Sequence, residues 1–512
     1  MSQPKRYVLF FGVVTAMVAL APGVQALEFD VGEMVIDLDT ELSYAAQWRV
    51  QGQDKRLIEG IAKNSVDDGD RNFDTGLVSN RAAVRVEMAA SYQDWSAFVR
   101  ANAFYDDVYE NEETDMDEAG YATYNDGRLL GGNVDLGDFP DATVDKHGSK
   151  ARILDAYVQY NFDMFDQGGS VRAGRQVISW GESTFFSGVN GLQNRIDAVA
   201  ARAPGAEVKE ILLPTGAAYL QTSLTDSLSA ELYYQYEWEQ SLLPGVGSYF
   251  STSDLTGPGA QRFVAGSFVF PKVEDQQPDD GGQWGAATRY FMDSGTELGL
   301  YFVKSHAKTP FPVIDLASGT YSNVYEDDIR TYAGSVSTLV GEASLLVDVL
   351  YSPNMAFIES TPFPSDVVRG HLFQSSVSWT DTIGQSALAD QIFYIGEVVY
   401  TRNNLGDNEL EGSAFGVTDD AWAYAARVIL NYESVLPGLD LEVPIVFQHQ
   451  VEGHASGVNQ FVDNTRQFSI GVDAFYLEVW KLNVTYAAFS GGGAANSVKD
   501  RDNISLSVKY TF

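Results

Sequence analysis

The chain ends in the stretch Asn503-Ile504-Ser505-Leu506-Ser507-Val508-Lys509-Tyr510-Thr511-Phe512. Counting back from the terminal Phe, every second residue is apolar, and the residues between them are Thr, Lys, Ser and Ser. Successive side chains of a β-strand point to opposite faces, so the stretch predicts a strand with one apolar and one polar face. A half-buried strand of a soluble sheet would give the same alternation. An aromatic terminal residue with a Tyr two positions before it is harder to explain in that way.

Tyr510 and Phe512 resemble the C-terminal signal of bacterial outer-membrane barrels, which the barrel-assembly machinery reads. In such a barrel the last strand pairs with the first, and closure removes the unpaired edge that lipid would leave unsatisfied. We therefore expect the barrel-assembly machinery to be a partner of this chain.

The first 26 residues are typical of a secretory signal peptide. Lys5 and Arg6 precede a short apolar run, and Val24-Gln25-Ala26 offers a small-residue cleavage site. A membrane anchor is the alternative, but the run is short for a spanning helix. We expect residues 1–26 to be a signal peptide and residues 27–512 to be the mature domain. The 512-residue chain has no Cys and a net charge of -37, which excludes disulfides and argues against nucleic acid as a partner.

Alternating segments recur along the whole chain. They lie at 36–50, 81–92, 95–105, 154–162, 170–179, 228–238, 283–291, 296–306, 329–336, 342–351, 372–380, 391–401, 422–432, 439–449, 466–476, 481–489 and 503–512. Short and long connections alternate between them. We count about eighteen strands, an even number that is typical of outer-membrane barrels. The predicted fold is all-β: a closed antiparallel transmembrane β-barrel with short periplasmic turns and long extracellular loops, surrounded by the lipid and lipopolysaccharide of a Gram-negative outer membrane. A soluble multi-sandwich or β-helix protein is the alternative.

The polar faces of the first strands carry charges of both signs. The expected lumen charges are Asp37, Asp39, Glu41, Arg81, Arg85, Arg100 and Arg152. A wet lumen tolerates such charges, whereas a lipid face does not. Opposed acidic and basic stripes could select solutes by charge, or adjacent pairs could neutralise one another inside a filled barrel.

The segment 181–214 is too apolar for a simple loop, and its aliphatic residues recur at helix-like spacing from Val208 to Leu212. We expect it to fold at or into the lumen as a gate, with Arg202, Glu207, Lys209 and Glu210 on the wet side; an outer cap is the alternative. The other gate residues are Trp180 and Asn190.

Asp68, Asp70, Asn72 and Asp74 place oxygen ligands at alternate positions, as a Ca²⁺ loop does. The sharp-turn Gly and the bidentate Glu of such a loop are absent, so a solvated acidic turn is the alternative. No other cofactor is expected. The sequence has no Gly-x-Ser-x-Gly, Walker or His-Glu-x-x-His motif, and we expect no enzyme, although a Ser–His site assembled from distant strands stays open.

Several motifs resemble the domain-of-unknown-function 1302 family of proteobacterial outer-membrane proteins. They are Arg172-Ala-Gly-Arg-Gln-Val-Ile-Ser-Trp-Gly-Glu-Ser183, Gly188-Val-Asn-Gly191, Arg202-Ala-Pro-Gly-Ala-Glu-Val-Lys-Glu210 and the acidic turn Asp67-Asp-Gly-Asp-Arg-Asn-Phe73. The likeness runs from near the mature N-terminus to Phe512. It departs at Gln193-Asn-Arg-Ile-Asp197, where an Asn-Pro-Ile-Asp turn is expected.

The resemblance implies limited functional information, because the family has no agreed activity. Its genes lie near those of a lipoprotein-localisation-like periplasmic protein and RND-type transporters, which implies movement of hydrophobic molecules across the envelope. The resulting hypothesis is a channel or transporter for hydrophobic or amphipathic small molecules of lipid, sterol or aromatic type. A general porin, a barrel-wall lipase and a structural barrel are the alternatives.

Overall fold

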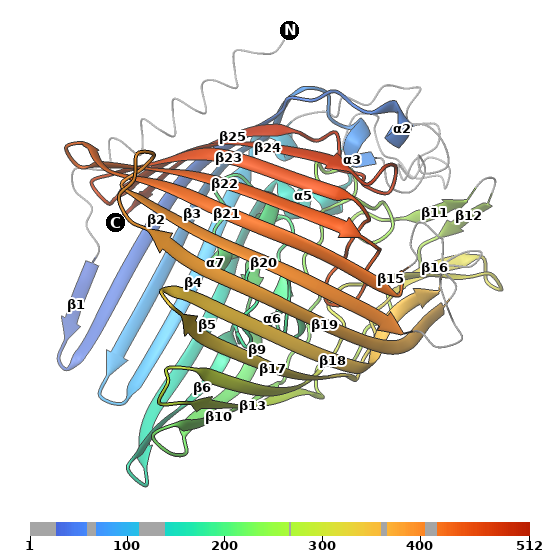
Figure 1. Ribbon diagram of the computed structural model, residues 1–512. Coiled ribbons are helices and arrows are strands. Elements are labelled where there is room, and N and C mark those ends of the chain that lie inside the picture. The colour runs from blue at the N-terminus through green and yellow to red at the C-terminus, as the bar shows by residue number, and fades with distance from the viewer. Residues whose placement is uncertain (1–26, 59–67, 112–138, 266–267, 360–365, 405–416) are drawn as a thin grey trace.

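A closed antiparallel β-barrel makes up most of the molecule, which we describe from a computed structural model (Figure 1). The structure describes residues 27–58, 68–111, 139–265, 268–359, 366–404 and 417–512. The expected signal peptide, 1–26, lies outside them. None of the helices in the described ranges is long and apolar enough to cross a bilayer.

Eighteen strands form the wall, each hydrogen-bonded to its neighbours. They are β2 (Met34–Arg49), β3 (Gly76–Tyr92), β4 (Trp95–Asp106), β5 (Ser149–Met164), β6 (Gln167–Gln176), β9 (Thr215–Ser223), β10 (Leu228–Gln235), β13 (Gln283–Phe291), β14 (Glu297–Ser305), β17 (Ile329–Val340), β18 (Ala343–Glu359), β19 (Asp366–Ile383), β20 (Gln391–Asn404), β21 (Asp420–Leu436), β22 (Leu439–Glu452), β23 (Thr465–Tyr476), β24 (Trp480–Gly491) and β25 (Asn503–Thr511). The predicted transmembrane barrel and its strand count are confirmed.

The C-terminal strand closes the barrel, as its alternation predicts. β25 pairs with β2 from Glu41↔Thr511 to Arg49↔Asn503. The backbones of Thr40 and Phe512 exchange two further hydrogen bonds, at 2.7 and 2.9 Å. The small polar side chains of β25 are buried inside, whereas Ile504 lies on the outer surface.

Two strands of this sheet, β1 and β9, were missed in the sequence. β1 (Leu27–Val31) folds back on β2 through a turn at Gly32, whose φ is +70°. β1 lies on the same edge of β2 as β25, just beyond the point where β25 ends. Its five residues alternate correctly, but so short a run next to the expected cleavage site was not recognised as a strand.

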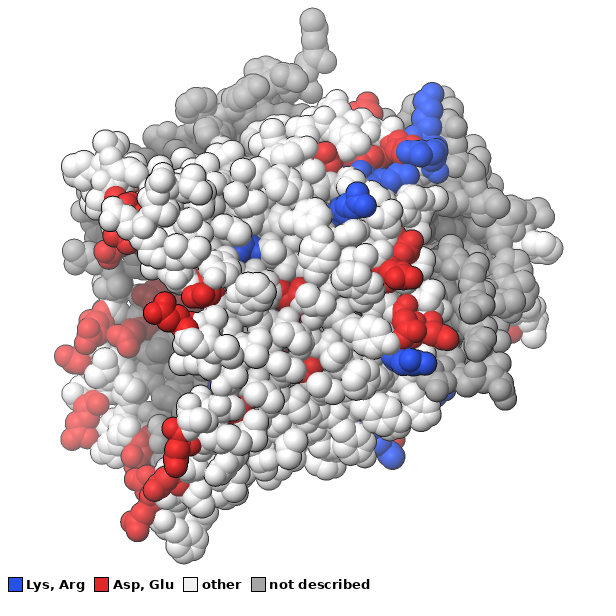
Figure 2. All heavy atoms as spheres, in the orientation of Figure 1, with Lys and Arg blue, Asp and Glu red and all other residues white. Residues whose placement is uncertain are grey.

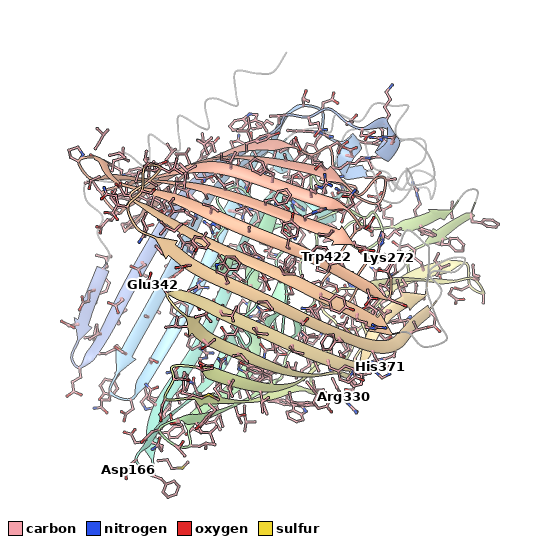
Figure 3. All side chains as sticks on the ribbon, viewed as in Figure 1. Asp166, Lys272, Arg330, Glu342, His371 and Trp422 are labelled. Carbon is pink, nitrogen blue, oxygen red and sulfur yellow. The ribbon has the colours of Figure 1, made fainter. Side chains whose placement is uncertain are left out.

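The outer surface is apolar between two polar rims. Val472 and Leu482 are exposed on it, whereas the neighbouring Asp473 is buried on the inside. Figure 2 shows few charges across the middle of the wall, with acidic side chains gathered toward the end that carries the short turns. Asp166 and Glu342 lie near that end, and Arg330 and His371 lie near the opposite one (Figure 3). This alternation is the one that a bilayer requires, and it places the barrel in an outer membrane.

The long connections carry most of the remaining structure. At the end opposite the C-terminus lie α2 (Lys55–Ile58), α3 (Asp68–Arg71), α5 (Asp141–His147) and the hairpins β11 (Arg262–Ala265)–β12 (Phe268–Pro271) and β15 (Phe311–Asp315)–β16 (Thr320–Val324) (Figure 1). α4 (Asp107–Asn111) continues directly from β4. One connection behaves differently: residues 177–214, between β6 and β9, contact the inner wall.

Candidate functional site

Residues 177–214, called the inner segment below, contact inward-facing side chains on two sides of the barrel. The segment contains α6 (Asn190–Gln193), β7 (Arg195–Ile196) paired with β8 (Leu212–Leu213), a 3-10 turn (Ala200–Arg202) and α7 (Val208–Ile211). It includes the whole predicted gate, 181–214. Because its secondary structure is in short pieces, side-chain contacts with the wall must hold it in place.

Two buried carboxylates hold the first part of the segment against the wall. The Asp348 Oδ2 atom, on β18, accepts hydrogen bonds from the Glu182 N–H at 2.7 Å and from the Ser183 N–H and hydroxyl at 2.9 Å. The Glu397 Oε2 atom, on β20, accepts the N–H groups of residues 184, 185 and 186 at 3.1, 2.5 and 3.2 Å. Ionised carboxylates that accept several backbone N–H groups make strong, directional contacts. Sequence reasoning missed both residues, although each stands at an inward position of its strand.

An apolar cluster reinforces this attachment. Trp180 and Val189 are buried against the inner wall, together with Leu350, Phe357 and Leu372 of β18 and β19. The Trp180 Nε1–H donates to Glu231 Oε2 of β10 at 2.5 Å. The segment therefore packs closely against this wall, and Trp180 belongs to the apolar cluster rather than to an open passage.

The predicted gate residue Asn190 acts within the segment itself. Its Oδ1 atom accepts the Gly188 N–H at 3.0 Å, and its backbone oxygen accepts the Asn194 side-chain N–H at 3.2 Å. Asn190 thus shapes the turn before α6.

Ion pairs hold the second part of the segment against the opposite wall. Glu207 lies 2.7 Å from the Lys509 Nζ of β25 and 3.4 Å from the Arg85 Nη2 of β3. Glu210 lies 3.3 Å from Arg85, and Lys209 lies 3.2 Å from Glu87. The side chains of Glu207 and Lys209 stay partly exposed, so their place on a wet side remains a prediction, but their charges are paired with wall residues of opposite sign.

Arg202, also predicted for the wet side, lies beside two aromatic rings that contact each other. Its guanidinium carbon lies 5.4 Å from the Phe250 ring and 5.6 Å from the Phe489 ring. Nearby, Gly205 has φ +73°, and an added Cβ would lie 2.6 Å from the Ser507 Oγ of β25. A glycine is needed there, because the backbone of the segment approaches the wall so closely.

Most of the predicted lumen charges take part in this network. Glu41 pairs with Arg85 at 2.7 Å, Arg100 pairs with Asp155 at 3.1 Å, and Arg152 pairs with Asp197 of the segment at 2.7 Å. Of the two alternatives, the structure favours neutralisation inside a filled barrel over opposed stripes across open water.

Three of the predicted lumen charges stand outside the ion pairs. Arg81 stacks over Phe104, with 3.6 Å to the ring centre. Asp37 and Asp39 are exposed near the short-turn end of β2, and no ion pair is recorded for either within the described ranges. The lumen is thus acidic at that end and neutralised further in.

Two of the predicted calcium ligands, Asp70 and Asn72, contact other parts of the protein. Residues 68–71 form a helical turn, and Asp70 pairs with the buried Arg49 at 2.7 Å. Asn72 donates to the Gly247 oxygen at 2.9 Å. No group of three or more His, Asp or Glu that could hold a metal occurs among the residues described. Burial, followed by the charge of Asp70, raises the pKa of the adjacent Asp500 to about 6.

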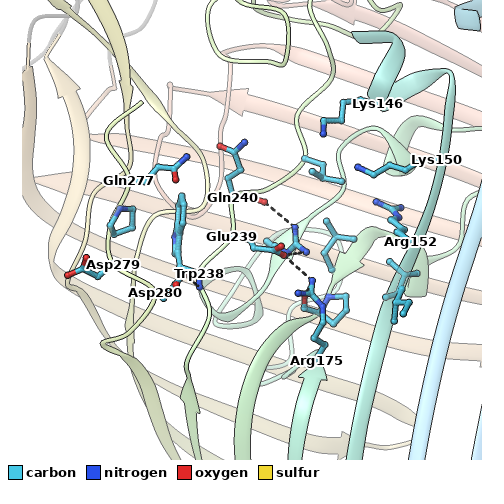
Figure 4. A pocket seen from close by; sticks show the side chains of 17 residues that line it. Lys146, Lys150, Arg152, Arg175, Trp238, Glu239, Gln240, Gln277, Asp279 and Asp280 are labelled. Carbon is cyan, nitrogen blue, oxygen red and sulfur yellow. Dashed lines mark hydrogen bonds and ion pairs between the residues drawn. The ribbon is translucent and has the colours of Figure 1, made fainter. Parts of the chain in front are cut away.

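A cavity of about 750 Å³ lies beside the inner segment (Figure 4). Lys146, Lys150 and Arg152 line one side, and Trp238, Asp279 and Asp280 line the other. Leu213 and Pro214, from the end of the inner segment, form part of its lining. The cavity combines apolar and charged surface, which suits an amphipathic solute.

Solved structures of similar fold are outer-membrane porins. Acinetobacter baumannii OccAB3 is 11% identical with a TM-score of 0.45, covering 93% of this chain and 99% of its own. A BenF-like porin from Pseudomonas fluorescens Pf-5 is 8% identical with a TM-score of 0.45, covering 93% and 98%. Pseudomonas aeruginosa OpdK, solved with vanillate, is 11% identical with a TM-score of 0.42, also covering 93% and 98%. The likeness extends no further than the barrel.

Comparison with curated proteins gives no match. The sequence model of one family does match, over residues 8–512, and that family is described as "Protein of unknown function (DUF1302)". The match contains all the motifs that carry the resemblance, from the acidic turn at residues 67–73 to the terminal Phe512. The chain therefore belongs to the DUF1302 family.

Proposed function

We propose that this protein is an outer-membrane channel or transporter for hydrophobic or amphipathic small molecules of lipid, sterol or aromatic type. The observation that carries the proposal is the inner segment: it is bound to two walls of the barrel and borders a cavity of about 750 Å³. An 18-stranded barrel is wider than its own side chains can fill, so a segment of this kind decides what passes.

The nature of the wall contacts favours such solutes over small hydrophilic ones. The segment contacts one wall through an apolar cluster and the other through a neutralised ion-pair network. A general porin instead keeps a polar, water-filled bore with fixed charges facing it. A general porin is the second candidate, and the exposed Asp37 and Asp39 at the short-turn end are the observation in its favour.

We extend the proposal to partners that would act on either side of the barrel. The barrel-assembly machinery would insert it, and lipopolysaccharide would surround its outer half. A lipoprotein-localisation-like periplasmic protein, working with an RND-type transporter, would exchange solute at the short-turn end.

Reconstitution of the purified barrel tests the proposal. Proteoliposomes should take up fluorescent lipid, sterol and aromatic probes faster than protein-free liposomes, and should swell little in sugar solutions. Rapid swelling in sugars together with a large steady conductance would instead identify a general porin. Uptake rates equal to those of protein-free liposomes for every solute would refute a transport function.

A further inference from the structure

The barrel wall has a gap beside β5. β5 pairs with β4 along its length, as far as Tyr105↔Ser149. On its other side β5 pairs with β6 only as far as Ala156↔Arg175, because β6 ends at Gln176 where the chain turns inward. No strand of the described chain pairs with residues 149–155 on that side.

The gap lies in the outer half of the bilayer-spanning wall. Trp95 and Tyr160 are exposed aromatic residues at the short-turn end of the β4–β5 pair, with ring centres 4.7 Å apart. Tyr105 is an exposed aromatic residue at the other end, directly opposite Ser149. Aromatic residues mark the two membrane–water interfaces of such barrels. Residues 149–155 therefore lie at the level of the outer leaflet.

The cavity extends around this free edge from the inside of the barrel to its outer face. Arg152 points inward, where it pairs with Asp197, whereas Ile153 lies on the outward face and is 60% exposed. Both residues line the same cavity. A cavity lined by both faces of one strand connects the two sides of the wall.

The β5 side of the cavity carries cations without acidic partners. No ion pair with an acidic residue is recorded for Lys146 or Lys150 in the part of the chain that the structure describes, although both are half-buried. By contrast, Arg175 pairs with Glu237 at 2.6 Å, and Arg195 contacts Glu239. Two neighbouring half-buried ammonium groups repel each other, and an anion held between them relieves that repulsion.

We propose that this gap is a lateral portal for long-chain amphipathic carboxylates. The carboxylate head binds Lys146 and Lys150, and the hydrocarbon chain passes Ile153 into the outer leaflet. This inference rests on the proposed transport function. It adds to that function a substrate class and a route. A free edge in a lipid-facing wall is costly unless protein, water or the polar head of a solute satisfies its backbone groups, and the head of an amphipath in transit suits that position.

Binding of a fluorescent long-chain polyene fatty acid to the purified barrel in phosphatidylcholine nanodiscs tests the head-group site. The acid should bind about tenfold more tightly than the matching long-chain alcohol, a ratio that corresponds to roughly 1.4 kcal/mol. The double variant Lys146→Gln/Lys150→Gln should remove that preference. Lys272→Gln is the matched control, because Lys272 pairs with Asp275 and does not line the cavity.

A second pair of variants tests the route. Ile153→Trp should slow transfer of the acid from the outer leaflet to the liposome interior at least about fivefold, because the indole fills the gap. Val158→Trp, on the same face of β5 but where β6 pairs with it, should transfer the acid at the wild-type rate. Equal slowing by both substitutions would overturn the portal.

The outcomes separate this inference from the function on which it rests. Equal binding of acid and alcohol would overturn the carboxylate portal. So would the finding that the two lysines bind added lipopolysaccharide but not the acid. Transport of other amphipaths would leave the proposed function standing in either case. Absence of transport for every probe would refute the proposed function itself, whether or not the acid binds.

Discussion

Releasing the inner segment from its carboxylate anchors should open the lumen to ions. The double variant Asp348→Asn/Glu397→Gln keeps the size of both side chains and removes both charges. These carboxylates are 3% and 2% exposed, and one oxygen of each accepts three hydrogen bonds from the segment. The substitutions therefore weaken six contacts without removing a strand pairing.

The size of the effect follows from those contacts. A hydrogen bond to a charged group contributes about 1.5–3 kcal/mol, and one to a neutral group contributes about 1 kcal/mol. A loss of at least about 0.5 kcal/mol per bond gives about 3 kcal/mol for six bonds. Relief of two buried charges offsets part of this loss. The equilibrium between bound and released segment should therefore shift by on the order of a hundredfold.

Single-channel recording in planar bilayers measures this shift. Wild-type protein should show rare, brief openings, and the double variant should show openings that are longer or about a hundred times more frequent. Asp381→Asn is the matched control, because Asp381 lies on β19 and bonds to Tyr394 instead of to the inner segment. An open probability that is the same in wild type, variant and control would refute the claim that these carboxylates hold the lumen closed.

Three other predictions follow from particular contacts. Deleting Phe512 removes two backbone hydrogen bonds to Thr40 and the assembly signal, so the amount of heat-modifiable barrel in the outer membrane should fall; unchanged amounts would contradict this role. Burial lowers the pKa of His147 to about 3, so local stability there is full above pH 6.5 and falls by about 2 kcal/mol at pH 5, which hydrogen exchange should detect in wild type but not in His147→Gln. Gly174→Ala should impair folding, because φ is +131° and the new Cβ would lie 2.2 Å from the Ala156 oxygen, whereas Gly334→Ala should fold normally.

The barrel was predictable because its signal is local. Alternation at period two is imposed on every lipid-crossing strand, and Asn503–Thr511 shows it in nine consecutive residues. β1 was missed because it alternates over only five residues, and so short a run cannot be distinguished from an irregular N-terminal segment. A Gly inside a strand, such as Gly174 in β6, is typical of a bulge, but its pairing with Tyr157 keeps register, and the residue has a positive φ.

The contacts of the inner segment were less predictable because they are not local. Inward parity identified Arg85 and Arg152 as lumen residues, but parity cannot say that Arg85 meets Glu207 or that Arg152 meets Asp197. The helix-like spacing from Val208 to Leu212 was interpreted as a helix with an apolar and a wet face, but so short a segment cannot form two such faces. α7 is a single turn, Val208–Ile211, and its charged residues bind the wall.

The chemistry of the two walls explains why the inner segment lies between them. It also explains why a solute route would run beside the segment, through the gap at β5. Val303, Leu350 and Leu372 are almost fully buried at inward positions of β14, β18 and β19, so this part of the wall needs an apolar partner beside its polar anchors. Glu41 on β2, Arg85 on β3 and Lys509 on β25 are charged residues at inward positions, and they need ions of opposite sign. The inner segment supplies both, and it must leave the wall after β6 to do so. Because the chain leaves the wall there, residues 149–155 of β5 have no neighbouring strand on that side. The same inward turn of the chain therefore fills the lumen and leaves the gap in the wall.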